Sequence, residues 1–372
     1  MMILGIDTST YLEELQNNAK YYLDGKQVDP LDVMHSNGVD HMRIRLWNNP
    51  FDGSGTPYLG GTCGTQNFLA LAKLAQSKGY KILLDFHYSD FWADPAKQFP
   101  PKAWQNYTLD ELCDAVYAFT KDTLLQAKAN DIQISMVQVG NEITNGILWP
   151  HGKLTGGANG LRNGYNNLVK LLKAGISACR EIFPSAQIVL HLERSYDQAV
   201  YVEFFTQMQH YNVDYDIIGM SYYPYWHGTP DMYFANVNNI KRFGKQIMAV
   251  ELGYGFTTEG FTINKDGQEI QLVLGTMTVD DYGVVNNYPL TPEGQARFIK
   301  DFIARAQKEG LDGIFYWEPL WLCGENICWA SPEGQDYINE GGKPTANEVA
   351  NCCLFDYHGN ALPALDAFAL KK

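Results

Sequence analysis

Two short apolar runs decide the fold, Lys81-Ile-Leu-Leu-Asp-Phe-His-Tyr-Ser89 and Met136-Val-Gln-Val-Gly-Asn-Glu142. Each has the length and the apolar content of a strand that is buried in a parallel sheet. Between them, Leu109 to Ala129 show the periodicity of an amphipathic helix. A strand, a helix and a second strand in this order predict a parallel βαβ unit.

The same alternation of strand and helix recurs along the chain. We predict eight strands: Ile3 to Asp7, His41 to Trp47, Lys81 to Ser89, Met136 to Glu142, Gln187 to Arg194, Ile217 to Pro224, Gln246 to Tyr254 and Gly313 to Pro319. Helices are predicted at Pro30 to Asn37, Asn67 to Lys78, Leu109 to Ala129, Asn163 to Ile182, Asp197 to Gln209 and Pro292 to Glu309. Gly38, Gly79 and Gly310 stand where helices commonly end. Eight strands close a barrel, so we predict an α/β fold, a (β/α)8 TIM barrel.

Long irregular segments lie on one side of this predicted barrel, because all of them follow strands. They are Asn48 to Gln66, Asp90 to Thr108, Gly146 to Arg162, Thr257 to Thr291 and Leu320 to Glu348. Barrel enzymes build their substrate grooves from such βα loops. The sequence has no internal repeat and no linker-like stretch, so residues 1–372 are predicted to form a single catalytic barrel domain.

Charge and composition exclude several classes of partner. With 28 basic and 42 acidic residues, the net charge of −14 would repel the phosphates of nucleic acids and of anionic membranes. The sequence contains no stretch that approaches the roughly 20 apolar residues of a membrane-spanning helix. We expect a monomer that binds neither nucleic acid nor a membrane.

Two glutamates are the natural pair for acid–base chemistry. Glu142 and Glu251 each follow a strongly apolar strand, so both should be partly desolvated and held by a stiff scaffold. Desolvation raises the pKa of a carboxyl group, which suits a general acid, while a nearby cation keeps its partner ionised. We expect Arg45 to be that cation. Such a pair predicts hydrolysis of a glycosidic bond, and the alternative is a structural ion pair at the rim of the barrel.

Asn141 supports the catalytic reading of Glu142, because an amide beside the acid can donate to a sugar hydroxyl. Neighbouring residues of a regular strand point to opposite faces, so the chain must turn or bulge at Gly140 for both to reach one site. Other polar and aromatic residues at or just after strand ends are predicted to bind substrate: Arg45, Asp85, His87, Asp90, Trp92, Tyr222, Tyr223, Trp226 and Trp317. The alternative is that polar residues simply gather where strands meet solvent.

His87 and Asp85 share one face of their strand. A metal site built from Asp85, His87, Asp90 and Asp94 is conceivable, but we favour His87 as a hydrogen-bond donor beside the nucleophile. All eight tryptophans fall at strand ends or in the segments that follow them, namely Trp47, Trp92, Trp104, Trp149, Trp226, Trp317, Trp321 and Trp329. Indole rings at the mouth of a barrel suit the apolar face of a hexopyranose, although each ring could equally pack a loop.

Several longer motifs resemble glycoside hydrolase family 53, the endo-β-1,4-galactanases that act on type I arabinogalactan. The matching stretches are Arg43-Ile-Arg-Leu-Trp-Asn-Asn-Pro50, Leu84-Asp-Phe-His-Tyr-Ser-Asp-Phe-Trp-Ala-Asp-Pro95, Val137-Gln-Val-Gly-Asn-Glu142, Ile218-Gly-Met-Ser-Tyr-Tyr-Pro-Tyr-Trp226 and Val250-Glu251. The second stretch is highly specific, whereas Gly-Asn-Glu is shared by many barrel glycosidases. The resemblance covers nearly the whole chain.

The resemblance implies a retaining mechanism with Glu142 as acid/base and Glu251 as nucleophile, whose carboxyl groups should lie about 5 to 5.5 Å apart. It implies no cofactor for catalysis. Some bacterial relatives bind structural calcium between the last two βα loops, and here Asn264 and Asp266 are the weak candidate ligands.

Three functions remain open at this point. The first is an endo-acting galactanase whose partner is the β-1,4-galactan of pectic side chains, with an extracellular or cell-surface location and a signal segment absent from this chain. The second is an exo-acting or differently specific glycosidase, such as a mannanase-like enzyme. The third is a catalytically silent sugar-binding barrel, against which the presence of both Glu142 and Glu251 speaks.

Overall fold

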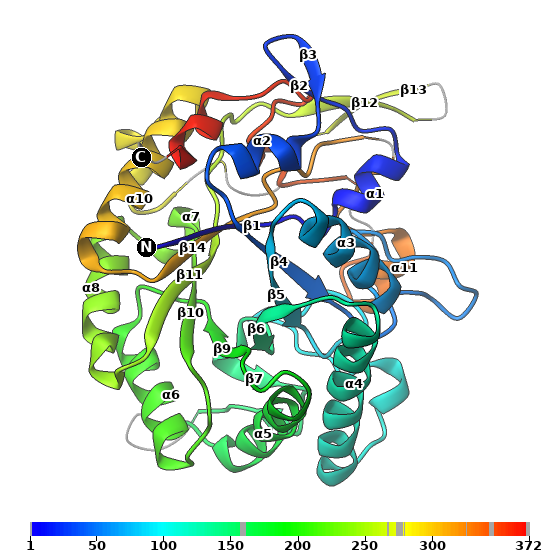
Figure 1. The fold of residues 1–372 in the computed structure, drawn as a ribbon, viewed down its shortest axis with the longest axis vertical. Helices are drawn as coiled ribbons and strands as arrows, with labels where there is room; N and C mark the ends of the chain where they lie inside the picture. The colour runs from blue at the N-terminus through cyan, green and yellow to red at the C-terminus, as the bar shows by residue number, and fades with distance from the viewer. Residues whose placement is uncertain are drawn as a thin grey trace.

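A closed barrel of eight parallel strands forms the centre of the molecule (Figure 1). The computed structural model describes residues 2–156, 161–265, 268–272, 278, 280–324, 326–341 and 346–369. The strands lie in the order β1-β14-β11-β10-β9-β6-β5-β4, so the first strand pairs with the last. Their bounds are β1 Ile3–Asp7, β4 His41–Leu46, β5 Lys81–Phe86, β6 Ile134–Val139, β9 Gln187–Leu192, β10 Ile217–Tyr222, β11 Gln246–Leu252 and β14 Gly313–Trp317. All eight predicted strands and the predicted TIM barrel are confirmed.

Helices surround the strands (Figure 1). They are α2 Pro30–Ser36, α3 Thr65–Ser77, α4 Leu109–Ala129, α5 Tyr165–Ile182, α6 Gln198–His210, α8 Pro230–Ile240 and α10 Pro292–Glu309. Helix α8 was not predicted, although its start carries a clear signal. The Thr229 side chain accepts from the Met232 backbone N–H, and Pro230 occupies the first turn. Gly38, Gly79 and Gly310 have φ values of 95°, 90° and 75°, as expected just past helix ends.

The long loops contain short elements of their own. Two-stranded hairpins are formed by β2 Tyr21–Leu23 with β3 Lys26–Val28, by β7 Gly146–Ile147 with β8 Gly152–Lys153, and by β12 Phe261–Lys265 with β13 Gln268–Leu272. Short helices are α1 Tyr11–Gln16, α7 Pro224–His227, α9 Val284–Asn287 and α11 Pro332–Tyr337. Hydrophobic periodicity is too weak over two to six residues to predict such elements.

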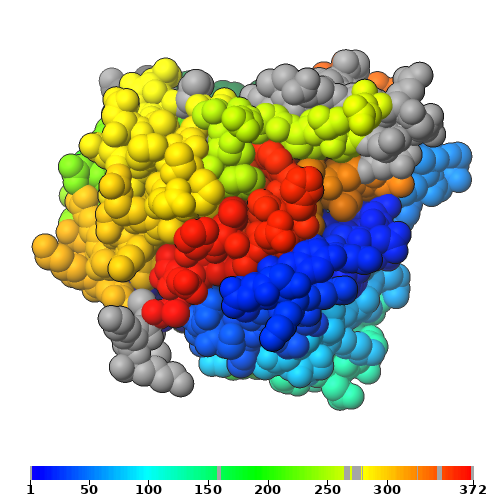
Figure 2. Space-filling view, turned by 90° about the horizontal axis from the view of Figure 1, so that it is seen from above, coloured from blue at the N-terminus to red at the C-terminus, as the bar shows by residue number. Residues whose placement is uncertain are grey.

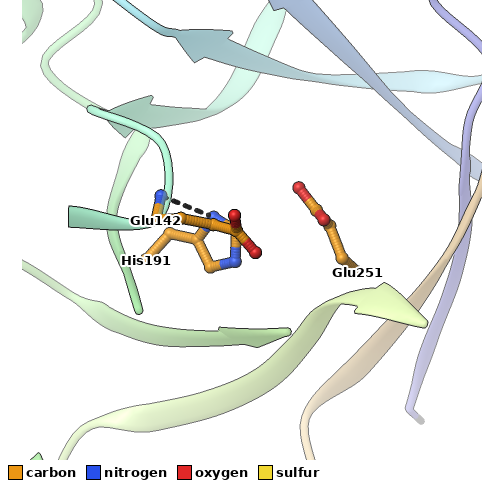
Figure 3. Close-up of side chains that lie close together, drawn as sticks. All are labelled: Glu142, His191 and Glu251. Atoms are coloured by element: carbon orange, nitrogen blue, oxygen red, sulfur yellow. Dashed lines mark hydrogen bonds between the residues drawn. The ribbon is translucent and has the colours of Figure 1, made fainter. Parts of the chain in front are cut away.

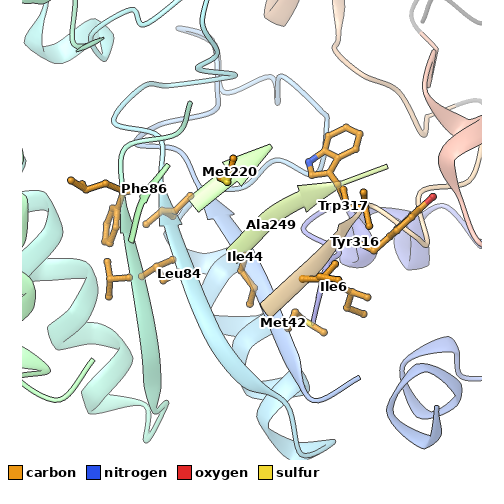
Figure 4. Close-up of a cluster of buried hydrophobic side chains, with 14 of the residues drawn as sticks. Ile6, Met42, Ile44, Leu84, Phe86, Met220, Ala249, Tyr316 and Trp317 are labelled. Atoms are coloured by element: carbon orange, nitrogen blue, oxygen red, sulfur yellow. The ribbon is translucent and has the colours of Figure 1, made fainter. Parts of the chain in front are cut away.

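The interior of the barrel has an apolar layer and a polar layer. Alternate strand residues form a buried apolar cluster of Leu83, Met136, Val189, Ile217, Met248, Val250 and Phe315. Two residues further along several of these strands, the side chains are polar and buried, as for Asp85, Gln138 and His191. The residues between them, such as Leu84 and Phe86, pack in the larger core between strands and helices (Figure 4). The polar layer therefore lies at the carboxyl ends of the strands.

The end of the chain ties the last βα unit to the first. The segment around the 3-10 helix Pro363–Phe368 lies against the N-terminal part of the molecule (Figure 2). Asn37, just after α2, donates to the Leu365 carbonyl oxygen at 3.1 Å, and the rings of Tyr316 and Phe368 meet edge to face. These contacts brace the barrel where β1 and β14 pair.

Gly5 on β1 tests the packing of the apolar layer. A Cβ atom at this position would lie 2.3 Å from Cδ1 of the buried Phe315 ring, a distance that no side chain tolerates. We expect Gly5→Ala to lower the free energy of unfolding by about 1 to 3 kcal/mol, as overpacked cores do. Urea denaturation measures this change.

The matched control is Gly53→Ala, because a Cβ at this exposed loop position meets nothing within 4 Å. We expect it to change stability by no more than about 0.5 kcal/mol. The double variant Gly5→Ala/Phe315→Leu should recover part of the loss. Equal stability of Gly5→Ala and Gly53→Ala would contradict the tight packing of this layer.

Candidate active site

Glu142 reaches the mouth of the barrel because the chain turns sharply after β6. Gly140 has φ +88°, and a Cβ there would lie 2.6 Å from Ile143 Cγ2, so only glycine fits. Glu142 itself adopts a left-handed conformation with φ +48°. The predicted turn at Gly140 is confirmed, and it brings both Asn141 and Glu142 to the same cleft.

Glu251 faces the cleft because β11 contains a bulge. Met220 pairs with Ala249, but the next residue of β10, Ser221, pairs with Glu251, so Val250 is an extra residue. Val250 lies in the apolar interior cluster, and the inserted residue lets Glu251 follow it toward the interior instead of the outer core. Glu251 is 6% exposed.

The two carboxyl groups lie across a narrow gap (Figure 3). A carboxylate oxygen of Glu142, one of Glu251 and a ring nitrogen of His191 all lie within 4.8 Å of one another. Both glutamates line a cleft of about 410 Å³ at the carboxyl ends of the strands. This arrangement places two acidic side chains, distant in sequence, around a space that a sugar ring can enter.

Glu142 sits in an environment that favours its protonated form. Burial raises its pKa well above the usual value, and the negative charge of Glu251 raises it further. Its only hydrogen-bond donor among the described residues is Ser221, whose Oγ donates to Oε1 at 2.6 Å. The Ser221 hydroxyl in turn accepts from Nε2 of His191 at 2.8 Å. His191 is neutral, because burial lowers its pKa well below the usual value.

Glu251 has stronger partners for a negative charge. Burial raises its pKa, but the guanidinium of Arg43 at 2.9 Å and the hydroxyl of Tyr223 at 2.8 Å both lower it. Charge-assisted hydrogen bonds of this kind stabilise the carboxylate. The two glutamates therefore differ in their surroundings in the way that an acid and a nucleophile require.

The cation beside Glu251 is Arg43, which corrects our expectation of Arg45. Both arginines lie on β4 and are 1% exposed. Arg45 instead forms an ion pair with Glu318 at 2.5 Å, and its guanidinium lies 4.4 Å above the ring of Trp92. Side chains two residues apart on a strand point to the same face, so both arginines face the barrel interior. The sequence alone could not tell which of them reaches the carboxyl pair.

Seven of the ten predicted substrate-binding residues line the cleft: Arg45, His87, Trp92, Asn141, Tyr223, Trp226 and Trp317. Asp85 does not line it, because it lies fully buried below Arg43 and accepts a hydrogen bond from that side chain at 2.9 Å. Asp90 is also buried, and it accepts from the backbone N–H groups of Asn49 and Lys102. These two aspartates hold the site in place rather than contacting the cleft.

A further prediction is corrected. Tyr222 lies in the core between β10 and the outer helices, where it stacks on Phe302 at 5.2 Å, because it points to the opposite face of the strand from Ser221. His87 lines the cleft, and the group that it contacts as a donor is Asp85. Its Nδ1 accepts from the Ala93 N–H at 3.2 Å, which leaves Nε2 to donate to Asp85 at 3.0 Å.

Aromatic rings form one wall of the cleft. Trp92 and Trp329 stack at 4.3 Å with their planes 5° apart, and Trp317 lies 6.4 Å from Trp92. Trp226, which is 46% exposed, also lines the cleft. Four further residues of the site were not predicted from the sequence: Arg43, Glu193, Ser221 and His227. Arg43 stands two residues from Arg45, which was among the predicted residues, and this spacing was the available signal.

Metal binding by the carboxyl pair is disfavoured by the state of His191. Glu142, His191 and Glu251 are close enough together to share an ion. However, Nε2 of His191 already meets Ser221, and Nδ1 accepts from Gln138 and from the Glu142 backbone N–H. Both ring nitrogens are thus engaged, whereas a ligating histidine offers one free nitrogen.

The structure describes one of the two weak calcium candidates. Asn264 belongs to the hairpin strand β12. Asp266 lies outside the described residues.

A closed (β/α)8 barrel whose mouth holds two glutamates with opposed electrostatic environments, beside a wall of tryptophans, defines a glycoside hydrolase. The model of the family described as "Glycosyl hydrolase family 53" matches residues 3–368. The chain therefore belongs to glycoside hydrolase family 53, and the resemblance noted from the sequence is confirmed.

In the part of the chain that the structure describes, every helix is too short or too polar to cross a lipid bilayer.

Known proteins match over nearly the whole chain. An endo-beta-1,4-galactanase of Bacillus subtilis is 32% identical, covering 98% of this chain and 85% of its own length. An arabinogalactan endo-beta-1,4-galactanase of Cellvibrio japonicus is 34% identical, covering 86% of this chain and 80% of its own length. The solved structure of the Ignisphaera aggregans GH53 catalytic domain is 37% identical, with a TM-score of 0.86 over 99% of this chain and 95% of that chain.

A second buried carboxyl cluster lies behind the tryptophan wall. The Thr10 hydroxyl lies 2.8 Å from an oxygen of Glu14 and 2.8 Å from an oxygen of Glu318. A hydroxyl has one hydrogen to donate, so a proton on one of the two carboxyl groups completes the pair of hydrogen bonds. Burial raises the pKa of Glu14 to about 8 and that of Glu318 to about 7.

Glu14 should therefore make stability depend on pH. Because the pKa of Glu14 is higher in the folded than in the unfolded chain, the free energy of unfolding falls as pH rises from about 4.5 to about 8. Glu14→Gln removes this titration, and its amide can donate to Thr10. We expect the thermal midpoint of the variant, relative to that of the wild type, to increase steadily from pH 5 to pH 8.

Glu111→Gln is the control for this measurement. Hydrogen bonds from Thr108 lower the pKa of the exposed Glu111, so this group stays ionised throughout the same pH range. Its difference from the wild type should be flat from pH 5 to pH 8. A flat difference for Glu14→Gln as well would show that Glu14 is ionised in the folded protein.

Proposed function

We propose that this protein is a retaining endo-β-1,4-galactanase that hydrolyses the β-1,4-galactan of type I arabinogalactan. The observation that carries the proposal is the pair Glu142 and Glu251, whose carboxylate oxygens lie within 4.8 Å. This gap is close to the roughly 5 to 5.5 Å of retaining enzymes and too short for the water that inverting enzymes place between their carboxyl groups. The substrate is inferred from the names of the relatives in Bacillus subtilis and Cellvibrio japonicus.

In the first step, an oxygen of Glu251 attacks the anomeric carbon while protonated Glu142 gives its proton to the glycosidic oxygen. The bond to the leaving sugar breaks, and a galactosyl ester of Glu251 forms. Arg43 and Tyr223 hold the nucleophile ionised and aimed at the gap. Asn141 is placed by the Ala93 carbonyl oxygen, to which its amide donates at 2.9 Å, and by Arg43.

In the second step, Glu142 takes a proton from water as the water attacks the anomeric carbon, which releases Glu251. Cleavage of the ester restores the negative charge of Glu251, and this charge again raises the pKa of Glu142. Double inversion leaves the product with the configuration of the substrate. The tryptophan wall offers flat apolar surface to the sugar rings.

Further proposals concern the domain organisation, the oligomeric state, the cofactor and the location of the protein. We propose that residues 1–372 form a single catalytic domain that acts as a monomer without a cofactor for catalysis. Its polymeric substrate cannot cross a membrane, so we propose an extracellular or cell-surface location. Structural calcium remains a proposal that rests on Asn264 and Asp266 alone.

Digestion of linear β-1,4-galactan beside mannan and xylan tests the substrate. We expect oligosaccharides from galactan at the earliest time points, with the new reducing ends first seen in the β configuration by proton NMR. Release of monosaccharide alone would indicate an exo-acting enzyme, and preference for mannan would indicate a mannanase-like one. Absence of hydrolysis of all three polymers would favour a silent sugar-binding barrel.

Removal of each glutamate tests the two roles. Glu142→Ala and Glu251→Ala should each lower kcat on galactan by roughly a thousandfold or more. With an activated aryl glycoside and added azide, Glu142→Ala should yield the β-glycosyl azide, because azide replaces water in the second step. Glu251→Ala should yield the α-glycosyl azide, because azide replaces the nucleophile. The same azide anomer from both variants would contradict the assignment.

A further inference from the structure

Glu193 is a third carboxyl group in the cleft, and the proposed mechanism leaves it without a role. It follows β9 directly and stands two residues beyond His191, so both side chains lie on the same face of the strand. His191 contacts Ser221 and the backbone N–H of Glu142. Glu193 therefore lies one step nearer the mouth, beside the acid. It lines the same cleft as Glu142 and is 4% exposed.

Neither carboxylate oxygen of Glu193 forms a hydrogen bond of good geometry among the described residues, although the hydroxyl of Thr144, itself without such a bond, lies close enough to lower the pKa of Glu193. A buried carboxyl group without partners is costly and uncommon in folded proteins. The nearby cations lower the pKa of Glu193 but form their ion pairs with other carboxylates, because Arg162 pairs with Glu203 at 2.8 Å and Arg194 pairs with Asp197 at 3.1 Å. The side chain is thus held in the cleft with most of its acceptor capacity unused, as is expected of a group that binds a ligand.

The charge of Glu193 acts on Glu142 more than on Glu251. Its charge raises the pKa of Glu142, second only to Glu251 among the charges. The charges that most affect the pKa of Glu251 are instead those of Arg43, Asp7 and Asp85. In the proposed mechanism, Glu251 attacks one sugar and Glu142 protonates the glycosidic oxygen, which departs with the leaving sugar. A group that lies beside Glu142 and away from Glu251 therefore faces the leaving sugar.

We propose that Glu193 binds the hydroxyl groups of the leaving sugar through its two carboxylate oxygens, and so selects a sugar over other alcohols at that subsite. This inference rests on the proposed function of the same cleft. A carboxylate offers two oxygens at the spacing of neighbouring hydroxyl groups, and hydrogen bonds to a charged acceptor are stronger than those between neutral groups. A leaving alcohol that carries no further hydroxyl group leaves this buried acceptor without a hydrogen bond. A site with such an unpaired buried group discriminates most strongly against the substrate that lacks the hydroxyl.

Substrate binding also couples Glu193 to the acid. Burial raises the pKa of free Glu193 to about 7, and hydroxyl donors from a bound sugar favour its ionised form. The resulting charge keeps Glu142 protonated. The other groups that act on Glu142 are Glu251, Asp94 and Ser221, and those that act on Glu193 are Thr144, Arg194 and Arg162.

The test compares two leaving groups that both need protonation. One substrate is a β-1,4-galacto-oligosaccharide, and the other is the methyl β-glycoside of the oligosaccharide one sugar shorter. At a pH where Glu142 is protonated, Glu193→Gln and Glu193→Ala should lower kcat/KM on the oligosaccharide about tenfold to a hundredfold. The loss on the methyl glycoside should stay below about threefold, because methanol offers no further hydroxyl to Glu193.

The pH profile gives a second readout. Without the charge of Glu193, the pKa of Glu142 falls, so the basic limb of kcat should move to lower pH in both variants. Glu181→Gln, which removes an exposed carboxylate paired with Lys121, is the control and should leave both readouts unchanged. Thermal unfolding confirms that the Glu193 variants are folded.

Equal losses on the two substrates, in folded variants, would overturn the proposal. If the wild type instead cleaves mannan or xylan, the proposed galactanase function fails, and the same comparison is made with oligosaccharides of that polymer. The leaving-group role of Glu193 is then supported or refuted on its own.

Discussion

The buried guanidinium of Arg43 is the interaction on which the site depends. It is 1% exposed, and it pairs with Asp7 at 2.7 Å, Asp85 at 2.9 Å and Glu251 at 2.9 Å. Burying a cation costs several kcal/mol unless ion pairs and hydrogen bonds offset the loss of water. These partners come from β1, β5 and β11, and Asn141 after β6 adds another acceptor. One side chain thereby fixes the relative positions of groups from distant parts of the chain.

The same arrangement explains why two buried glutamates in one cleft behave differently. Glu251 receives a cation and a tyrosine hydroxyl, whereas from the described residues Glu142 receives only a serine hydroxyl and faces further negative charge. The roles that we propose for them follow from what the barrel places around each of them, not from the residue type. The mouth of the barrel also keeps an unpartnered carboxyl group at Glu193, a local cost to stability of the kind that binding sites commonly carry.

Much of the architecture could be predicted from the sequence, because strands and helices leave periodic patterns. All eight barrel strands were located, and the bounds of α4 and α10 were predicted to the residue. The turn at Gly140 was also predictable, since neighbouring strand residues cannot share a face without it. The two glutamates stood out because each follows an apolar strand whose carboxyl end must lie at the mouth of a barrel. Local pattern and fold topology were sufficient for these features.

The partners of each side chain were decided only by the tertiary structure. Period two places Arg43 and Arg45 on one face of β4, but which of them meets Glu251 depends on how far each strand is shifted against its neighbours. Glu251 faces the cleft because of a one-residue bulge in β11, and Tyr222 was misplaced because its strand buries both faces and leaves no alternation to read. Glu193 was overlooked for a related reason. Its importance comes from the absence of partners across the barrel, and the register and closure that set those distances are properties of all eight strands together.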